Sequence, residues 1–324
     1  MRAVKTAMDT AVMRAVSPAS WGGPELLREI EVIRPEPGPG EILVRVKAAG
    51  VNATDWKSRA TGGLGLWDEP AILGHDVSGV VEAVGIGVRL FEPGDEVFGM
   101  PRFPHQAGAY AQYLAAPARH FARKPHEIDH IEAAALPLAS LTAWQALVDT
   151  AHVEAGQRVL IHAAAGGVGH LAVQVAKALG AYVIGTARKA NHAFVYGLGA
   201  DEVVDYTTLD FAAVVRDIDI VFDLVGGDCG KRSLEVLTSG GTLVSLAAPA
   251  EEALVPQAAK LGVRAGFMLV EPDHFAMNAI ADLVAAGRLR PRVDTVLPLW
   301  EAPKAHAIGE QGHTVGKMVL TLGD

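Results

Sequence analysis

The segment Arg158–Ala181 (RVLIHAAAGGVGHLAVQVAKALGA) joins an apolar run to a glycine cluster and then to a helical pattern. Gly166 and Gly167 allow the backbone to bend and to approach a pyrophosphate without a Cβ in the way, and Gly169 allows close packing of helix on strand. The helix N-terminus offers free N–H groups and the positive end of its dipole to phosphate oxygens. Ala164 replaces the first glycine of the usual G-x-G-x-x-G. The segment therefore predicts a variant dinucleotide-binding turn.

The end of the next predicted strand indicates which dinucleotide is bound. An NAD-binding chain usually carries Asp or Glu there to bind the ribose 2′-hydroxyl, but no acidic residue occurs between Ala155 and Ala200. The strand ends instead at Arg188 and Lys189, two cations that suit a 2′-phosphate. Tyr206, after the third strand, adds a hydroxyl donor. The pattern favours NADPH, and the alternative is that both cations only solvate a loop.

Two kinds of structure must position these residues. The 324 residues are 50% hydrophobic, which suits two domains with substantial cores. Many short strands with Gly and Pro turns make residues 1–124 a β-rich domain, completed by predicted strands within 290–324. Strands and helices alternate over 125–289, which predicts a doubly wound parallel sheet of the Rossmann type. The predicted fold class is α/β, with a single helical run at Ile131–Thr150 kinked by Pro137.

Composition excludes several other classes. The formal charge of −9 disfavours nucleic acid as a partner. Cys229 is the only cysteine, which rules out an internal disulfide or a cysteine zinc cluster. The uncharged stretches, among them Ala133–Val148, are shorter than the roughly 20 residues of a membrane span. Met1–Val16 shows no apolar signal region, so we expect a cytoplasmic protein.

At this point the sequence resembles the medium-chain dehydrogenase/reductase superfamily, and within it the zinc-free NADPH quinone oxidoreductase (zeta-crystallin-like) branch. The resemblance implies a GroES-like catalytic lobe, a Rossmann lobe and an active site in the cleft between them. It also implies a homodimer joined at Rossmann sheet edges, for which Val263–Val270 is suited, although an ordinary core strand is the alternative. The stretches that carry the resemblance are Gly22–Leu27, Pro35–Val46, Gly50–Trp56, Gly74–Gly94, His162–Gly169 and Gly312–Leu320.

The resemblance also assigns cofactor-binding residues. Val315 stands where the family often has Arg or Thr, which removes one expected phosphate contact. The implied cofactor residues are Asn52 and Thr142 at the nicotinamide, Gly166, Gly167, Val168 and Gly169 at the pyrophosphate, Arg188, Lys189 and Tyr206 at the adenosine phosphate, Val225 and Leu246 along the nicotinamide, and Lys317 in the terminal Gly-Lys pair.

The metal ligands of the zinc enzymes are incomplete. Gly74-His75-Asp76 resembles their Gly-His-Glu, but Asn52 stands at their first cysteine position, and a neutral amide is a poor zinc ligand. Cys229 lies in the other half of the chain. We therefore expect no metal, and we expect His75 and Asp76 to form hydrogen bonds inside the catalytic lobe.

Without zinc, the accessible chemistry is hydride transfer from NADPH to an acceptor that is already electrophilic, a quinone or an α,β-unsaturated carbonyl. The candidate catalytic residues are Asn52, Asp55, Lys57 and Tyr110. The candidate proton donors are Lys57, Tyr110 and a bound water, with Asp55 as a helper, and plain surface charges are the alternative for Asp55 and Lys57.

Aromatic residues are the candidates for the acceptor site. Trp56, Trp67 and Phe103 form either an acceptor wall or ordinary core. Residues Gly62–Trp67 and Pro249–Val255 would discriminate quinones from enones. A zinc-type alcohol dehydrogenase and a non-catalytic NADPH-binding sensor or interaction protein remain the alternatives.

Overall fold

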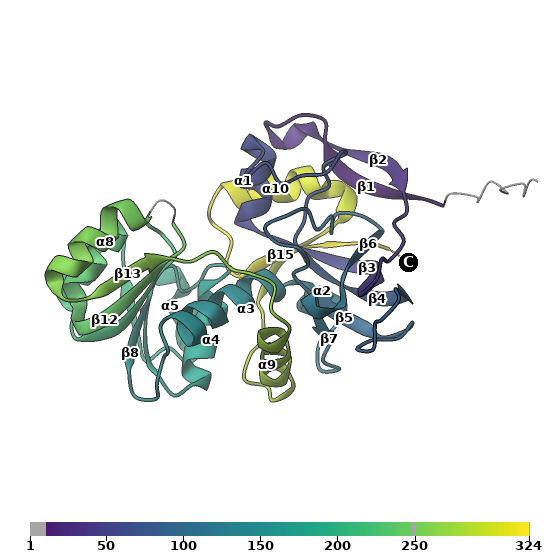
Figure 1. Cartoon of the computed structure of the whole chain (residues 1–324). Coiled ribbons are helices and arrows are strands. Elements are labelled where there is room, and N and C mark those ends of the chain that lie inside the picture. Colours follow the sequence, from purple (N-terminus) through teal and green to yellow (C-terminus); the bar gives the residue numbers. More distant parts are fainter. Residues whose placement is uncertain (1–10, 248–249, 324) are drawn as a thin grey trace, which may run out of the picture.

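The computed structural model describes residues 11–247 and 250–323 and contains two lobes (Figure 1). One lobe is built on a six-stranded parallel sheet of order β10-β9-β8-β11-β12-β13. The order reverses between β8 and β11, which is the point where open α/β sheets bind ligands. The Rossmann-type sheet predicted from the sequence is confirmed. Its strands are β8 (Arg158–Ile161), β9 (Tyr182–Ala187), β10 (Glu202–Asp205), β11 (Ile218–Asp223), β12 (Leu237–Ser245) and β13 (Arg264–Phe267).

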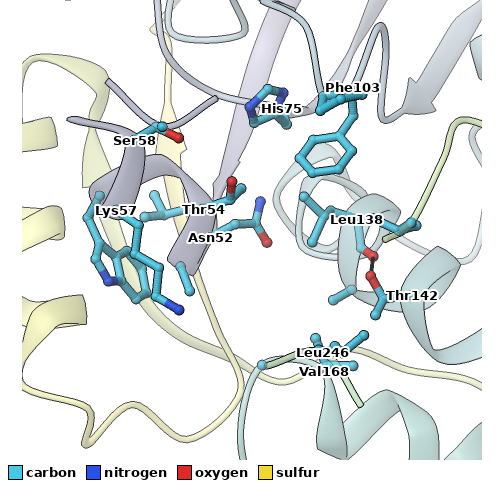
Figure 2. Close-up of a pocket in the computed structure, with 18 of the residues that line it drawn as sticks. Asn52, Thr54, Lys57, Ser58, His75, Phe103, Leu138, Thr142, Val168 and Leu246 are labelled. Atoms are coloured by element: carbon cyan, nitrogen blue, oxygen red, sulfur yellow. Dashed lines mark hydrogen bonds between the residues drawn. The ribbon is translucent and has the colours of Figure 1, made fainter. Parts of the chain in front are cut away.

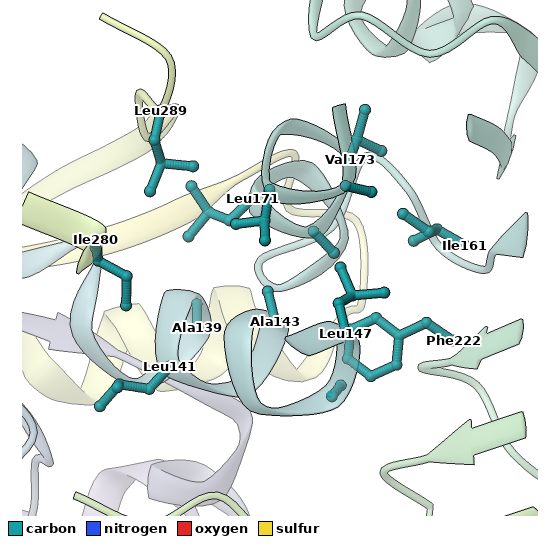
Figure 3. Packing of buried hydrophobic residues seen from close by; sticks show 14 of the residues in the cluster. Ala139, Leu141, Ala143, Leu147, Ile161, Leu171, Val173, Phe222, Ile280 and Leu289 are labelled. Atoms are coloured by element: carbon teal, nitrogen blue, oxygen red, sulfur yellow. The ribbon is translucent and has the colours of Figure 1, made fainter. Parts of the chain in front are cut away.

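Both faces of this sheet are buried. Alternate residues of β8 point to opposite faces, as the period of a strand requires. Val159 and Ile161 pack in the core that also contains Leu171, while Leu160 packs on the other face against Phe211. Figure 3 shows the first of these cores, in which helix side chains such as Leu171 and Ile280 lie in the same cluster as Ile161 of the sheet. The near-continuous apolar β8 is therefore explained by burial on both faces.

The second lobe is built from both ends of the chain. The long strand β3 pairs with β4 and β6, and β15 pairs antiparallel with its C-terminal half. The two C-terminal strands thus join the N-terminal lobe, although the predicted boundaries at 124 and 290 remain a prediction and residues 1–10 lie outside the described residues. The strands of this lobe are β1 (Val12–Pro18), β2 (Leu27–Ile33), β3 (Glu41–Val51), β4 (Asp76–Val84), β5 (Glu96–Gly99), β6 (Tyr113–Pro117), β7 (Phe121–Arg123), β14 (Val293–Pro298) and β15 (Lys317–Thr321).

Helices cover the sheets and connect the lobes. In Figure 1, α3 lies between the two lobes, with α9 below it near β7. No helix in the described part of the chain is long and apolar enough to cross a membrane. The helices are α1 (Ala53–Thr61), α2 (His130–Ala134), α3 (Pro137–Trp144), α4 (Gly169–Ala178), α5 (His192–Gly197), α6 (Phe211–Val214), α7 (Asp228–Ser233), α8 (Ala250–Leu261), α9 (His274–Ala285) and α10 (Ala302–Glu310).

The helical run predicted over Ile131–Thr150 is not one kinked helix. It is divided into α2, α3 and a π-helical stretch at Gln145–Thr150. Pro137 is the first residue of α3, where its missing N–H costs nothing because that group has no intrahelical partner. The proline therefore begins a new helix rather than bending an old one.

Candidate active site

Two cavities lie along the cofactor-binding edge of the parallel sheet. The first, of about 840 Å³, opens between the lobes, and the second, of about 930 Å³, lies over the Rossmann lobe. Gly312 and Thr314 line both, so the two cavities adjoin there. Figure 2 shows the first cavity, with side chains from both lobes around it: Asn52, Thr54, Lys57 and Ser58 on one side, Leu138 and Thr142 on the other, His75 and Phe103 at one end, and Val168 and Leu246 at the opposite end.

The glycine turn lies where the cavities adjoin. Gly166 lines the second cavity, whereas Gly167 and Val168 line the first. A Cβ on Gly169 would lie 2.2 Å from the carbonyl oxygen of Ala163, so only glycine allows α4 to begin this close to the loop. The turn and the N-terminus of α4 thus have the geometry for a pyrophosphate bridging two cavities.

The second cavity has a basic and polar rim at the end of β9. Arg188 donates from Nε to the Tyr206 hydroxyl over 3.0 Å, and its Nη1 lies 3.4 Å from Nδ1 of His313. Lys189 does not line this cavity, because the chain turns into a short 3₁₀ helix at that residue. The structure therefore places Arg188 and Tyr206 together and leaves Lys189 apart.

Two residues of this cavity were not anticipated from the sequence. His313 comes from the loop before β15, 125 positions from Arg188, and no local pattern connects them. Arg232 lines the same cavity, paired with Asp210 and stacked with its guanidinium 5.1 Å from the Phe211 ring. Asp210 lines this cavity too, but its carboxylate is paired with Arg232, so it repels a bound anion less than an unpaired carboxylate would.

The predicted nicotinamide residues divide between the cavities. Thr142 and Leu246 line the first cavity, and the Thr142 hydroxyl donates to the Leu138 carbonyl over 2.6 Å. That bond directs the hydroxyl back into α3. Val225 lines the second cavity and is 58% exposed, so it lies nearer to the adenosine side than the resemblance implies.

A closed polar network forms one wall of the first cavity. Asp76 accepts hydrogen bonds from Asn52 Nδ2 over 2.9 Å, from the Leu138 N–H over 2.7 Å and from Lys317 Nζ over 3.2 Å. Lys317 also donates to the Asn52 side-chain oxygen. The Asn52, Asp76 and Lys317 side chains are all buried. The expectation of hydrogen bonding is confirmed for Asp76.

Asp55 lies behind this wall and not in the cleft. It accepts from the Asn52 N–H over 2.7 Å, as the first turn of α1 requires, and is fully buried. Burial raises its pKa to about 7, with the nearby Asp76 carboxylate adding to the effect. The capping interaction turns this carboxylate inward, so the expectation that it assists a proton donor in the cleft does not match its position.

Tyr110 is also away from the cleft. Its hydroxyl lies 3.3 Å from Nε2 of His306, and its side chain is fully buried. Burial, followed by the Asp55 carboxylate, raises the pKa of this phenol well above its ordinary value. Of the three predicted proton donors and helpers, only Lys57 lines the cleft. Tyr110 therefore packs in the core of the catalytic lobe, where it cannot reach an acceptor.

The acceptor side of the cleft is aromatic. Trp56, Trp67 and Phe103 all line it, as the acceptor-wall hypothesis requires. The His75 ring meets the Phe103 ring edge-on at 4.9 Å between centroids and lies 6.1 Å from that of Trp67. The expectation of a hydrogen bond for His75 is wrong within the described residues, because its Nδ1 is buried without a partner.

The segments expected to select the acceptor are partly in place. Between Gly62 and Trp67, the cleft-lining residues are Gly63, Leu64, Leu66 and Trp67. Pro249 lies outside the described residues, and neither Leu254 nor Val255 lines the cleft, whereas Ala247 just before this segment does. The described positions are largely apolar, which suits a flat, hydrophobic acceptor.

Comparison with known proteins identifies the family. Residues 38–126 match the alcohol dehydrogenase GroES-like domain, and residues 198–320 match a family described as zinc-binding dehydrogenase. The chain is 32% identical over 333 residues to the mitochondrial NAD(P)H oxidoreductase RTN4IP1 of Danio rerio, covering 88% of this chain and 84% of that protein. The chain belongs to the medium-chain dehydrogenase/reductase superfamily. It is an oxidoreductase of that superfamily, with a nicotinamide cofactor.

Other members extend the match to nearly the whole chain. A 2-haloacrylate reductase of Burkholderia sp is 35% identical, over 92% of this chain and 96% of its own length. The structure of the quinone oxidoreductase from Coxiella burnetii superimposes with a TM-score of 0.91 at 36% identity, covering 97% of this chain and 100% of that one. The GroES-like and Rossmann lobes and the quinone oxidoreductase resemblance predicted from the sequence are thereby confirmed.

Proposed function

We propose that this oxidoreductase uses NADPH to reduce a quinone or an α,β-unsaturated carbonyl without zinc. The observation that carries the proposal is the first cavity itself. Its aromatic end faces the glycine turn across the cavity, and the carboxylate of Asp76 in the wall between them is already engaged by Asn52 and Lys317. Such a site can hold a flat acceptor against a nicotinamide but offers no Lewis acid.

The side chains present do not fit a catalytic zinc. The family model matched by residues 198–320 is described as zinc-binding, yet the Asp76 carboxylate faces the Lys317 ammonium at 3.2 Å. A cation at this carboxylate would be repelled by that ammonium, and Asn52 supplies only a neutral amide. Within the described ranges, no three His, Cys, Asp or Glu side chains are grouped as metal ligands. The reaction we propose therefore uses no metal.

The residues present do fit NADPH. Arg188, Tyr206 and His313 offer cationic and polar donors for a 2′-phosphate. Where the two cavities adjoin, the Thr314 hydroxyl is buried without a partner, which provides a free donor beside the glycine turn. A buried polar atom of this kind costs free energy unless a ligand satisfies it. The bound nicotinamide would supply a hydride.

The chain's own contribution is orientation and exclusion of water. Val168 and Leu246 offer apolar contacts to the cofactor ring, and the aromatic end of the cleft holds the acceptor against it. As the acceptor carbon receives the hydride, its oxygen receives an electron pair and then one proton from water. Lys57, exposed at the cleft, is the one predicted donor placed to assist that proton.

The test is NADPH oxidation against 1,4-benzoquinone, 9,10-phenanthrenequinone, a short enal and a simple aldehyde, with and without a chelator. We expect turnover of quinones or enals, unchanged by chelator, and none of the aldehyde. Chelator-sensitive turnover of the aldehyde would instead indicate a zinc-type alcohol dehydrogenase. NADPH binding with no turnover of any acceptor would favour a sensor or interaction protein.

We also propose a homodimer joined through β13. This strand is at one edge of the parallel sheet, and in the described part of the chain it pairs only with β12. Its residues are only partly buried or exposed, which leaves backbone groups free to pair with a second copy. Sedimentation measurements on the wild type and on Ala265→Pro test this. A monomeric wild type would contradict it.

A further inference from the structure

His75 lies at the end of the cleft opposite the cofactor turn. Figure 2 shows its ring beside Phe103, across the cavity from Val168 and Leu246. An acceptor stacked on the nicotinamide would therefore lie between the cofactor and this ring. The side chain is only 1% exposed, yet it lines the cavity, so the surface that remains accessible faces the acceptor.

The His75 ring is neutral and aligned by its surroundings. Burial lowers its pKa to about 4, and its close ring neighbours are the apolar Phe103 and the indole of Trp67. Nδ1 is buried without a hydrogen-bond partner, whereas Nε2, which has no hydrogen-bond partner among the described residues either, is not one of the fully buried atoms of this cavity-lining residue. Placing the proton on Nε2 avoids burying an N–H without an acceptor.

We propose that His75 is a catalytic residue that donates a hydrogen bond from Nε2–H to the carbonyl oxygen of the acceptor. The inference rests on the proposed reductase function and names the group that replaces a metal at the acceptor oxygen. As hydride reaches carbon, negative charge develops on that oxygen, and a donor already oriented in an apolar cavity stabilises it. No proton leaves His75, since water supplies the proton of the product.

The cost of the histidine to folding supports this role. A buried ring nitrogen without a partner destabilises the folded state, and an apolar residue of similar volume would remove that penalty. His75→Leu should therefore fold at least as stably as the wild type while losing activity, which is the pattern expected of a residue retained for function. If His75 had a purely structural role, His75→Leu would lower stability and leave activity unchanged.

A matched control exists in His306. It is also fully buried, its pKa is lowered by burial to about 3, and its Nδ1 is likewise without a partner. It does not line the first cavity, and its Nε2 is engaged by the Tyr110 hydroxyl at 3.3 Å. His306→Leu should lower stability by removing that contact and leave acceptor reduction within about twofold of the wild type.

The experiment compares His75→Leu, His75→Gln and His306→Leu. For His75→Leu we expect about a 100-fold lower kcat/KM for quinone or enal, as for loss of one oxyanion donor, with NADPH affinity unchanged. His75→Gln keeps a side-chain N–H at similar reach and should recover at least tenfold of that loss. A kcat/KM for His75→Leu within twofold of the wild type would overturn the proposal.

A second readout does not depend on turnover. With NADP⁺ bound, benzophenone and diphenylmethane are titrated by calorimetry, since diphenylmethane carries two hydrogens in place of the carbonyl oxygen. His75→Leu should weaken benzophenone about 3- to 10-fold and leave diphenylmethane unchanged. Equal effects on the two ligands would overturn the role of His75. If the wild type reduces no acceptor and His75→Leu still weakens benzophenone alone, the result would contradict the proposed reductase function but support the contact between His75 and a carbonyl oxygen.

Discussion

Lys317 Nζ lies 3.2 Å from Oδ2 of Asp76, although the two residues are 241 positions apart. Both side chains are buried, 3% and 0% exposed. Lys317 begins β15, its stem lies close to Gly167 of the cofactor turn, and its ammonium also reaches Asn52. One ion pair therefore ties the C-terminal strand, the catalytic lobe and the glycine turn together.

Removing one member of this pair should be costly. Lys317→Met leaves the Asp76 carboxylate buried without its cation, and we expect a loss of about 3–5 kcal/mol in the free energy of unfolding, measured with guanidinium. The double variant Lys317→Met/Asp76→Asn should recover part of that loss, since no uncompensated charge remains. Equal stability of Lys317→Met and the wild type would show that the pair contributes little.

Cofactor choice should depend on Arg188 much more than on Lys189. Arg188→Ala removes one or more charge-assisted hydrogen bonds, each worth about 1.5–3 kcal/mol, so NADPH affinity should fall by roughly 10- to 100-fold. NADH affinity should hardly change. Lys189→Ala is the matched control, because that residue does not line the cavity. Calorimetry with both cofactors checks this, and equal affinities of the wild type for NADPH and NADH would contradict it.

Local chemistry explains what the sequence could predict. The apolar run and the helical pattern predicted within Arg158–Ala181 correspond to β8 and α4. Here the apolar run, the glycines and the helix pattern all agree, and each acts over a few residues. Arg188 was found for the same reason, since it directly follows the second strand.

The rest depends on contacts between distant segments. Nothing local joins His313 to Arg188 or Lys317 to Asp76, because the return of the C-terminal strands creates both pairs. Asp55 is different. Asn52 and Asp55 have the spacing of a capping box, which indicates a carboxylate turned back on its own helix start. That spacing was available in the sequence and argues against a role in the cleft.

Asp55 should make stability depend on pH. Its pKa in the folded protein, about 7, lies above its ordinary value of 3.8, so unfolding releases a proton between these limits. The contribution of Asp55 to the free energy of unfolding is therefore fully present below about pH 4 and is lost as the pH rises through 7. The shift of about 3 units corresponds to about 4 kcal/mol. Asp55→Asn should therefore gain stability relative to the wild type by up to that amount between pH 4 and 8.

Denaturant unfolding of both proteins across this pH range measures the difference. Asp129→Asn is the control, because Asp129 caps α2 from an exposed position through the Glu132 N–H. The difference between this variant and the wild type should vary much less with pH. A pH-independent difference for Asp55→Asn would mean that Asp55 is already ionised at pH 5.

Gly169 should be the least replaceable glycine of the cofactor turn. In Gly169→Ala the new Cβ would lie 2.2 Å from the Ala163 carbonyl oxygen and 2.9 Å from Cα of Ala164, both backbone atoms that cannot rotate away. The turn must move, so we expect at least tenfold weaker NADPH binding and a loss of about 1–3 kcal/mol in stability. Gly197→Ala is the control, since Gly197 ends α5 and a methyl group there would have nothing within 4 Å. There the substitution should leave NADPH binding unchanged and stabilise the protein by up to about 1 kcal/mol.

Calorimetric titration with NADPH measures the effect of each substitution on cofactor affinity, and thermal unfolding without NADPH measures its effect on stability. Tight NADPH binding by Gly169→Ala would mean that the pyrophosphate lies elsewhere.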